Sequence, residues 1–286
     1  FFKIRMSASL DEDQQACVKA LGVAVSNRST LVTKAGAGSG KTHTMAYAIS
    51  QYPGALGISH TNLACETMSQ RIERFSAACD MYIYTIHSIA SRLTGYTVKD
   101  SVDPESGVDF DRMLERAIAL LRDSEFSLPI WLSSRRYLVV DEFQDTGSVQ
   151  NTLIGLLRQR LCCALAVVGD FAQAIYGFQD ATSEHMNNLR TRSDCVEVTL
   201  RNNYRSHHSI VAHANRLSHA SNGGIAGAIE MRATRFPRAG TREMPLHLRC
   251  YRSDSDLVHA VARWILNRAR QGILVAGDAL SLYPTK

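Results

Sequence analysis

The chain has 286 residues, of which 45% are hydrophobic and 21% charged, a composition typical of one large or two ordinary globular domains. Its net charge of +5 is a mild bias toward polyanions that decides nothing alone. The cysteine count is odd and no Cys-x-x-Cys pair occurs, which argues against a disulfide framework or a zinc site. The sequence shows neither an apolar run long enough to span a membrane nor a signal peptide.

Short apolar or β-branched runs alternate along the chain with helical patterns. This alternation predicts an α/β fold, with a mainly parallel sheet covered by helices on both faces. Ligands bind such sheets at the carboxyl ends of the strands. We expect strands at 30–35, 55–59, 81–85, 136–141, 163–169 and 195–200, and helices at 11–21, 41–51, 62–76, 86–93, 109–123, 146–160 and 206–220.

Two segments interrupt the alternation. The polar stretch 95–108 leads into a short helical insert that we expect within 109–132. A second break, 221–245, is rich in glycine and proline. After this break we expect a strand at 246–251, an amphipathic helix at 255–270 and the start of another strand at 279–283.

The first chemical motif is a glycine-rich turn between the first strand and the second helix. Backbone N–H groups of such a turn converge on phosphate oxygens, Lys41 adds a positive charge, and the Thr42 hydroxyl can bind Mg²⁺. The usual pattern begins with glycine, but a small alanine still fits the tight turn. The predicted phosphate-binding residues are Ala35, Gly36, Ala37, Gly38, Ser39, Gly40, Lys41 and Thr42.

The second chemical motif is the apolar strand Leu138–Val140, which is followed by two carboxylates. Asp141 can hold the Mg²⁺ shell, and Glu142 can orient and activate a water molecule. The two motifs together predict a site that hydrolyses a nucleoside triphosphate.

Further motifs follow one another along nearly the whole chain. They are Leu10–Gln14, His60–Glu66, Tyr84–His87, Asp141–Asp145, Gly169–Phe178 and Asn203–Ser206. Together with the glycine-rich turn, seven motifs in this order resemble those of superfamily 1 DNA helicases of the UvrD/Rep type.

The resemblance implies a RecA-like P-loop NTPase domain that uses ATP and Mg²⁺. It assigns adenine recognition to Gln14, adenine stacking to Tyr204, and a nucleotide contact to the position of His43. It also implies that Gln173 touches the γ-phosphate or the attacking water and that Arg205 acts as an arginine finger. The implied catalytic residues are therefore Lys41, Glu142, Gln173 and Arg205.

The same resemblance implies that single-stranded DNA is the partner and that translocation runs 3′ to 5′. Aromatic rings can stack on successive bases without sequence preference. The residues that the resemblance places on DNA are His60, Thr61, Asn62, His87, Tyr176 and Phe178. We expect no membrane partner and a cytoplasmic or nucleoid-associated location.

Several positions depart from the family pattern. His43 replaces an arginine, and Gln179 stands where an arginine usually follows the aromatic residue. His60 replaces a phenylalanine of the DNA-contacting segment, and Leu63 replaces a lysine. These changes predict weaker or differently tuned contacts to nucleotide and DNA, although His60 could still stack on a base.

The expected organisation is a RecA-like ATP-binding motor domain at 1–205, with a short helical insert near 95–132. Residues 206–286 would form the hinge and the start of a second RecA-like domain, whose later motifs do not occur before Lys286. Two interpretations therefore stand: an ATP-dependent DNA helicase and translocase, or a catalytically incomplete nucleotide-binding module that serves a partner such as a nuclease in a repair or defence complex.

Overall fold

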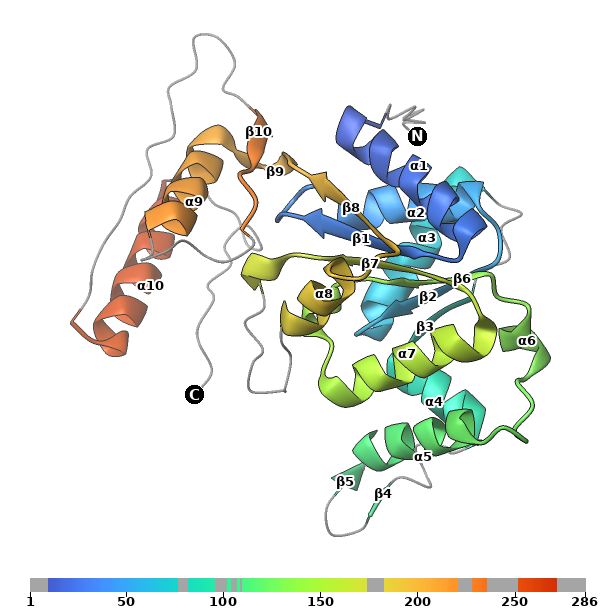
Figure 1. Cartoon of the computed structure of the whole chain (residues 1–286). Coiled ribbons are helices and arrows are strands. Elements are labelled where there is room, and N and C mark those ends of the chain that lie inside the picture. The colour runs from blue at the N-terminus through green and yellow to red at the C-terminus, as the bar shows by residue number, and fades with distance from the viewer. Residues whose placement is uncertain are drawn as a thin grey trace. The chain divides into compact units, whose positions relative to one another are not determined.

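The computed structural model describes residues 10–76, 82–95, 102–103, 107–108, 110–173, 183–220, 228–235 and 252–271. Its central sheet has the strand order β3-β2-β6-β7-β1-β8, and every neighbouring pair is parallel (Figure 1). These strands are β1 (Thr30–Ala35), β2 (Ala55–Ser59), β3 (Tyr82–Thr85), β6 (Tyr137–Val140), β7 (Ala164–Gly169) and β8 (Cys195–Leu200). All six lie where the sequence predicts them, and the predicted parallel α/β architecture is confirmed.

Helices cover both faces of this sheet. One hydrophobic cluster joins the sheet to α1 (Glu12–Asn27), α2 (Lys41–Gln51) and α3 (Asn62–Phe75). The other cluster joins it to α4 (Ile86–Thr94), α5 (Phe110–Arg122), α6 (Ile130–Ser133), α7 (Ser148–Leu161) and α8 (Ser183–Arg190).

Strand β6 shows why two separate cores form. Val139 packs in the first cluster, whereas Leu138 and Val140 pack in the second, because successive side chains of a strand point to opposite faces. All three are buried, and full burial of such a side chain contributes roughly 1.5–3 kcal/mol. The two cores therefore fix the carboxyl end of β6, where Asp141 and Glu142 follow.

Helix α1 continues six residues beyond the end that the sequence predicts at residue 21. A Cβ on Gly22 would lie 2.4 Å from the Tyr52 hydroxyl. The glycine therefore serves close packing, and the buried Ala24 and Val25 carry the helix onward. It ends at Arg28, which is left-handed with φ 53°.

The insert before β6 contains a strand pair that the sequence does not predict, followed by helices. It contains the antiparallel pair β4 (Val102–Asp103) and β5 (Gly107–Val108), followed by α5 and α6. Arg160 of α7 donates hydrogen bonds to the carbonyl oxygens of Leu121 at 2.9 Å and Asp123 at 2.6 Å, and also to that of Phe126. This side chain thereby holds the end of α5 against α7.

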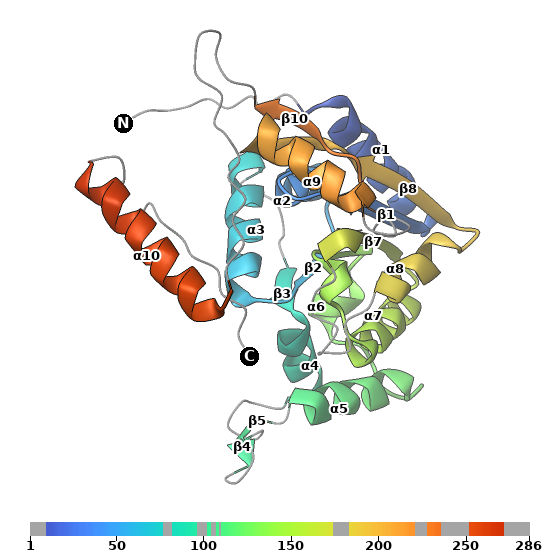
Figure 2. The same ribbon diagram turned by 90° about the vertical axis from the view of Figure 1, so that its left-hand side faces the viewer.

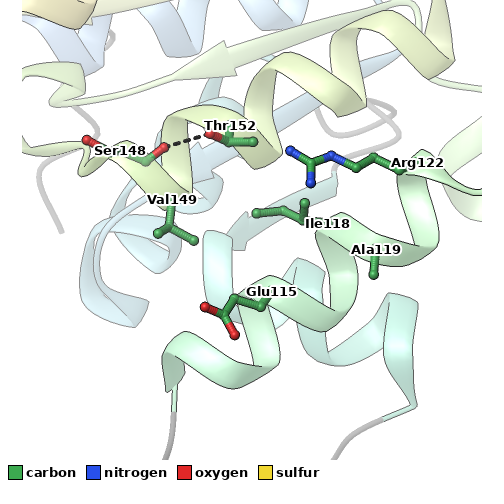
Figure 3. A pocket seen from close by; sticks show the side chains of 7 residues that line it. All are labelled: Glu115, Ile118, Ala119, Arg122, Ser148, Val149 and Thr152. Atoms are coloured by element: carbon green, nitrogen blue, oxygen red, sulfur yellow. Dashed lines mark hydrogen bonds between the residues drawn. The ribbon is translucent and has the colours of Figure 1, made fainter.

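A groove of about 320 Å³ runs between α5 and α7 (Figure 3). Its lining combines the apolar Ile118 and Val149 with the charged Glu115 and Arg122. The groove shares no residue with the nucleotide site predicted from the sequence.

After β8 the chain forms a β-α-β unit that the sequence predicts only in its helix. Strand β9 (Asn202–His207) leads into α9 (His208–Ala220), and β10 (Arg232–Arg235) pairs with β9 in parallel (Figure 1). Figure 2 shows α9 beside β10. Residues 1–242 form one compact unit, and residues 243–286, with α10 (Asp254–Arg270), form another. The domain boundary after residue 205 stays a prediction, and the strands expected at 246–251 and 279–283 lie outside the described residues.

None of the helices in the described ranges combines the length and the apolar character that a bilayer crossing requires.

Candidate nucleotide site

The P-loop connects strand β1, which lies between β7 and β8 in the sheet, to the first turn of α2. Gly38 and Gly40 adopt left-handed φ angles of 69° and 80°, which glycine reaches without steric cost. Gly40 is the N-cap of α2 and caps the helix with no side-chain hydrogen bond. The first N–H groups of α2 are therefore open to an anionic ligand.

Ser39 supplies a second sign of an anion site in this loop. It is 2% exposed, and its hydroxyl finds no hydrogen-bond partner among the described residues. A buried hydroxyl without a partner is costly, and a phosphate oxygen in the loop would be a suitable acceptor. The loop therefore offers an anion both open backbone N–H groups and a buried hydroxyl.

Strand β9 packs directly on the P-loop through Asn203, which is 2% exposed. Its Nδ2 donates to the carbonyl of Ala37 at 2.6 Å, and its Oδ1 accepts the N–H groups of Arg205 at 3.0 Å and Ser206 at 2.7 Å. The N–H of Tyr204 donates to the carbonyl of Gly38 at 2.9 Å. Asn203 thus places the Tyr204–Arg205 pair beside the loop.

The contact is close enough to require glycine at position 38. A Cβ there would lie 2.7 Å from the Cβ of Arg205 and 3.1 Å from Oδ1 of Asn203. The backbone of Arg205 is therefore next to the P-loop, while its side chain is exposed. The role of Arg205 in the nucleotide site stays a prediction.

The carboxylates Asp141 and Glu142 follow the end of β6. Asp141 is 4% exposed, and its N–H donates to the carbonyl of Ile58 in β2 at 3.0 Å. Glu142 has a left-handed backbone with φ 51°, which costs a residue with a Cβ about 1–2 kcal/mol. Its N–H donates to Oδ1 of Asp141 at 3.0 Å.

The structure brings the two predicted catalytic motifs into direct contact. Nζ of Lys41 lies 2.7 Å from Oε2 of Glu142. Burial alone would raise the pKa of Glu142, but the charge and the hydrogen bond of Lys41 bring it below its ordinary value. Glu142 is therefore ionised at neutral pH and able to accept a proton.

Two neighbouring carboxyls behave in the opposite way. Burial, and then the charge of Glu142, raise the pKa of Asp141 to about 6, and the same two causes raise the pKa of Asp145 to about 6. A buried carboxylate beside a second carboxylate is a place where a divalent cation would be favourable. The oxygen ligands of Asp141 and Thr42 match the preference of Mg²⁺, so these residues fit the predicted metal.

Gln144 connects these carboxylates to the loop after β7. It is 2% exposed, and its Nε2 donates to Glu142 at 3.0 Å and to Asp145 at 3.3 Å. Its Oε1 accepts the N–H of Asp170 at 3.0 Å. Asp170 in turn accepts a 2.6 Å hydrogen bond from Nε2 of Gln173, which links the predicted Gln173 to Glu142 through Gln144.

The predicted adenine side consists of Gln14 and Tyr204. Both lie near Gly40, since a Cβ there would be 3.0 Å from Nε2 of Gln14 and 3.9 Å from the Tyr204 ring. The amide of Gln14 donates to the carbonyl of Ser39 at 3.4 Å and accepts the N–H of Asp11 at 3.2 Å. These two bonds use one of the two N–H donors of the amide and one of the two lone pairs of its oxygen.

The ring of Tyr204 is held by Asp11, the N-cap of α1. The Tyr204 hydroxyl donates to Oδ2 of Asp11, which also accepts Nδ2 of Asn202 at 2.8 Å. Burial and the bond to Asp11 raise the pKa of Tyr204 to about 12, so the hydroxyl remains a donor. The ring is 38% exposed and offers a face for stacking.

His43 lies in the first turn of α2, as predicted, and its ring packs edge-on against Phe75 with centroids 5.2 Å apart. Burial, and then the charge of Arg71, lower the pKa of His43. The charge of Arg71 also acts to lower the pKa of Asp141. The charge of Arg71 of α3 therefore acts on both of these groups.

The predicted DNA residues separate into three groups. Thr61 and Asn62 are exposed at the start of α3, where Thr61 is the N-cap. His60 and His87 are half-buried, and His87 packs on Phe110 with centroids 4.9 Å apart. The predicted stacking residues, Tyr176 and Phe178, lie outside the described residues.

Sequence reasoning missed four residues of the site: Asp11, Arg71, Gln144 and Asn203. Asp11, Gln144 and Asn203 stand inside motifs that the sequence displays. Arg71 lies on α3, five residues after the motif His60–Glu66. Their side-chain partners belong to distant segments, so the motifs indicate importance but not the contact.

Comparisons with known proteins show what the chain is similar to. The model of the UvrD/REP helicase N-terminal domain matches residues 12–103 and 96–194. The chain is 34% identical over 136 residues to the ATP-dependent DNA helicase PcrA of Leuconostoc citreum, which covers 47% of this chain and 18% of that protein. It is 34% identical over 111 residues to the ATP-dependent DNA helicase Rep of Buchnera aphidicola subsp. Baizongia pistaciae, which covers 38% of this chain and 16% of that protein.

Among solved structures, the unliganded Pif1 of Bacteroides sp is similar with a TM-score of 0.42 and 16% identity, over 72% of this chain and 45% of that chain. The chain spans 18% and 16% of the length of the PcrA and Rep helicases it matches.

Proposed function

Because the chain belongs to the UvrD/REP helicase family, we propose that its site binds ATP with Mg²⁺ and hydrolyses it to drive movement on single-stranded DNA. The observation that carries this proposal is the 2.7 Å contact between Lys41 of the P-loop and Glu142. It joins the group that would hold the phosphates to the group that would activate water. The activity belongs in the cytoplasm or on the nucleoid, where DNA and ATP are present.

The proposed reaction is attack of a water oxygen on the γ-phosphorus, with a proton passing to Glu142 and ADP leaving with inorganic phosphate. Lys41 and the P-loop N–H groups would hold the phosphate oxygens. Thr42 and Asp141 would hold Mg²⁺, whose bound charge neutralises the phosphates. Gln173 would orient the γ-phosphate or the water, and Arg205 would stabilise the charge that develops in the transition state.

Paired substitutions test these assignments. Lys41→Ala should abolish productive binding of a fluorescent ATP analogue, because the phosphates lose their cation. Glu142→Gln should retain binding and slow single-turnover hydrolysis by about 10²–10⁴-fold, the usual contribution of a positioned base. Wild-type hydrolysis by Glu142→Gln would show that another group activates water.

The DNA partner is tested separately with a fluorescent oligothymidine. Binding should weaken with salt and show little sequence preference. Phe178→Ala should weaken binding by an amount equivalent to about 1–3 kcal/mol, the usual contribution of one stacked base. Unchanged affinity in a folded Phe178→Ala variant would remove that residue from the DNA path.

If the chain is instead a catalytically incomplete module, we expect the wild-type chain to bind Mg²⁺-ATP without hydrolysing it. The contact between Lys41 and Glu142, together with the buried Asp141, supports hydrolysis instead. A wild-type chain that binds Mg²⁺-ATP but never releases phosphate, with or without DNA, would favour the alternative.

A further inference from the structure

His60 directly follows β2, one residue before the N-cap of α3. Its side chain is half-buried, and its Nε2 lies 3.1 Å from the backbone carbonyl oxygen of Glu142. His60 therefore contacts the backbone of the proposed catalytic base from the loop that begins the predicted DNA-contacting segment.

The Glu142 carbonyl belongs to a residue with an uncommon backbone conformation. Its φ angle is 51°, a region in which residues with a Cβ persist only when surrounding contacts hold them. That carbonyl accepts the N–H of Asp145 at 2.9 Å in addition to the imidazole of His60. These bonds fix the peptide, while Lys41 and Gln144 contact the carboxylate itself.

The contact also fixes the chemistry of the imidazole. A carbonyl oxygen can only accept, so Nε2 of His60 must carry the hydrogen. Burial is the main reason that the pKa of His60 lies below its ordinary value, so the ring is neutral at physiological pH and its hydrogen resides on Nε2. Phenylalanine, which the family resemblance places at this position, has no donor for this carbonyl.

We propose that His60 is a positioning residue for Glu142, whose imidazole N–H holds the Glu142 peptide in its left-handed conformation. The proposal rests on the proposed function of Glu142 in ATP hydrolysis. It gives His60 a role different from base stacking, which the sequence pattern suggested. The exposed residues Thr61 and Asn62 come directly after His60 in the sequence. The hydrogen bond of His60 therefore connects the loop that would lie on DNA to the proposed base.

Two substitutions at this position separate positioning from stacking. His60→Phe keeps an aromatic ring of similar size and removes the donor. His60→Gln removes the ring and keeps an N–H donor, separated from Cα by the same number of bonds as Nε2 of histidine. A positioning role predicts that glutamine is the better replacement, whereas a stacking role predicts that phenylalanine is.

The first measurement uses the 286-residue chain with Mg²⁺-ATP under single-turnover conditions. We expect His60→Phe to hydrolyse ATP at least about 10-fold more slowly, since small misplacements of catalytic groups are costly, with nucleotide affinity and oligothymidine affinity unchanged within about twofold. His60→Gln should hydrolyse within about threefold of the wild-type rate. The reverse order, or equal rates in all three proteins, would overturn the proposal.

The second measurement does not depend on turnover. Imidazole ¹⁵N spectra of histidine-labelled protein, with the His60 signals assigned by their loss in His60→Gln, report which nitrogen carries the hydrogen. We expect the neutral Nε2–H form at pH 7.5, and an Nδ1–H form would overturn the proposal. A wild-type chain that binds neither Mg²⁺-ATP nor oligothymidine would contradict the proposed function, while this spectrum would still decide the contact.

Discussion

Nζ of Lys41 and Oε2 of Glu142, which are far apart in the sequence, form a 2.7 Å ion pair between the P-loop helix and the end of β6. In the ligand-free protein the proposed phosphate-binding cation is thus held by the proposed base. An incoming triphosphate must draw Lys41 away from Glu142, and in doing so it frees the carboxylate for water. The ion pair is therefore a competitor of nucleotide binding.

Removal of the Glu142 charge should consequently strengthen ATP binding as well as block turnover. The Glu142 side chain is 39% exposed, and pairs of this kind contribute roughly 0.2–1 kcal/mol. We expect Glu142→Gln to bind Mg²⁺-ATP up to about fivefold more tightly than wild type. Glu73→Gln, an exposed substitution on α3, is the matched control, and an affinity equal to or weaker than this control would contradict competition by the ion pair.

Asp141 should make the ligand-free protein less stable as the pH rises. Its pKa is raised from 3.8 to about 6, so between these values the folded protein binds a proton that the unfolded chain releases. Its contribution to stability is complete below pH 3.8 and is lost as the pH rises through 6. A shift of this size corresponds to at most about 3 kcal/mol, and Asp145 acts in the same direction.

The measurement is the free energy of unfolding of wild type and Asp141→Asn at pH 5 and pH 7.5. The variant keeps the acceptor for the Glu142 N–H and has no proton to release, so its stability advantage over wild type should be larger at pH 7.5 than at pH 5. The pKa of Glu142 lies below its ordinary 4.5, so that group does not titrate in this range. Glu73→Gln is the control and should behave as wild type. If wild type and Asp141→Asn lose the same free energy of unfolding between pH 5 and pH 7.5, Asp141 is already ionised at pH 5.

The central sheet could be predicted because its four inner strands are short, mostly apolar runs that are buried on both faces. The runs at β1, β6 and β7 are separated by helical patterns, and this combination strongly favours buried parallel strands over any other structure. Strand β9 gave no such signal, because Asn202–His207 is polar. It forms through contacts that no local pattern contains, including the hydrogen bonds from Asn203 and Tyr204 to the P-loop.

The sequence predicted which residue types form the site, but not which of these side chains contact one another. Motifs supplied Lys41, Asp141 and Glu142, since phosphate and Mg²⁺ binding require these residue types in this order. The contacts depend on the left-handed backbone at Glu142 and on the buried amide of Gln144. Neither has a periodic signature, so His60 was assigned to DNA alone and Gln144 was not assigned at all.

Asn203 should couple fold stability to nucleotide binding. Asn203→Ala leaves the carbonyl of Ala37 and the N–H groups of Arg205 and Ser206 without this partner, and an unsatisfied buried group costs about 1–3 kcal/mol. We expect a lower free energy of unfolding and weaker Mg²⁺-ATP binding, measured by chemical denaturation and by titration. Asn188→Ala, on the exposed surface of α8, is the control. A loss of stability without any change in nucleotide affinity would limit Asn203 to a structural role.

Gly169 at the end of β7 and Gln144 after β6 should be energetically coupled. A Cβ on Gly169 would lie 2.6 Å from Oε1 of Gln144, the atom that accepts the Asp170 N–H. Gly169→Ala therefore has to displace the Gln144 amide, which also loosens its bond to Glu142. In a Gln144→Ala background this atom is absent and the remaining contacts of the Cβ, with the backbone N of residue 144 and Sδ of Met186, are at 3.3 Å, so the same glycine substitution should cost less.

The four proteins of this double-mutant cycle give the coupling directly from their free energies of unfolding. We expect each single substitution to destabilise the fold and the double variant to be more stable than the sum of the two predicts, by about 0.5–3 kcal/mol. Single-turnover hydrolysis should follow the same pattern, because all three altered proteins lose the same support of Glu142. Strict additivity in both measurements would show that Gly169 is required for some reason other than the space that Gln144 occupies.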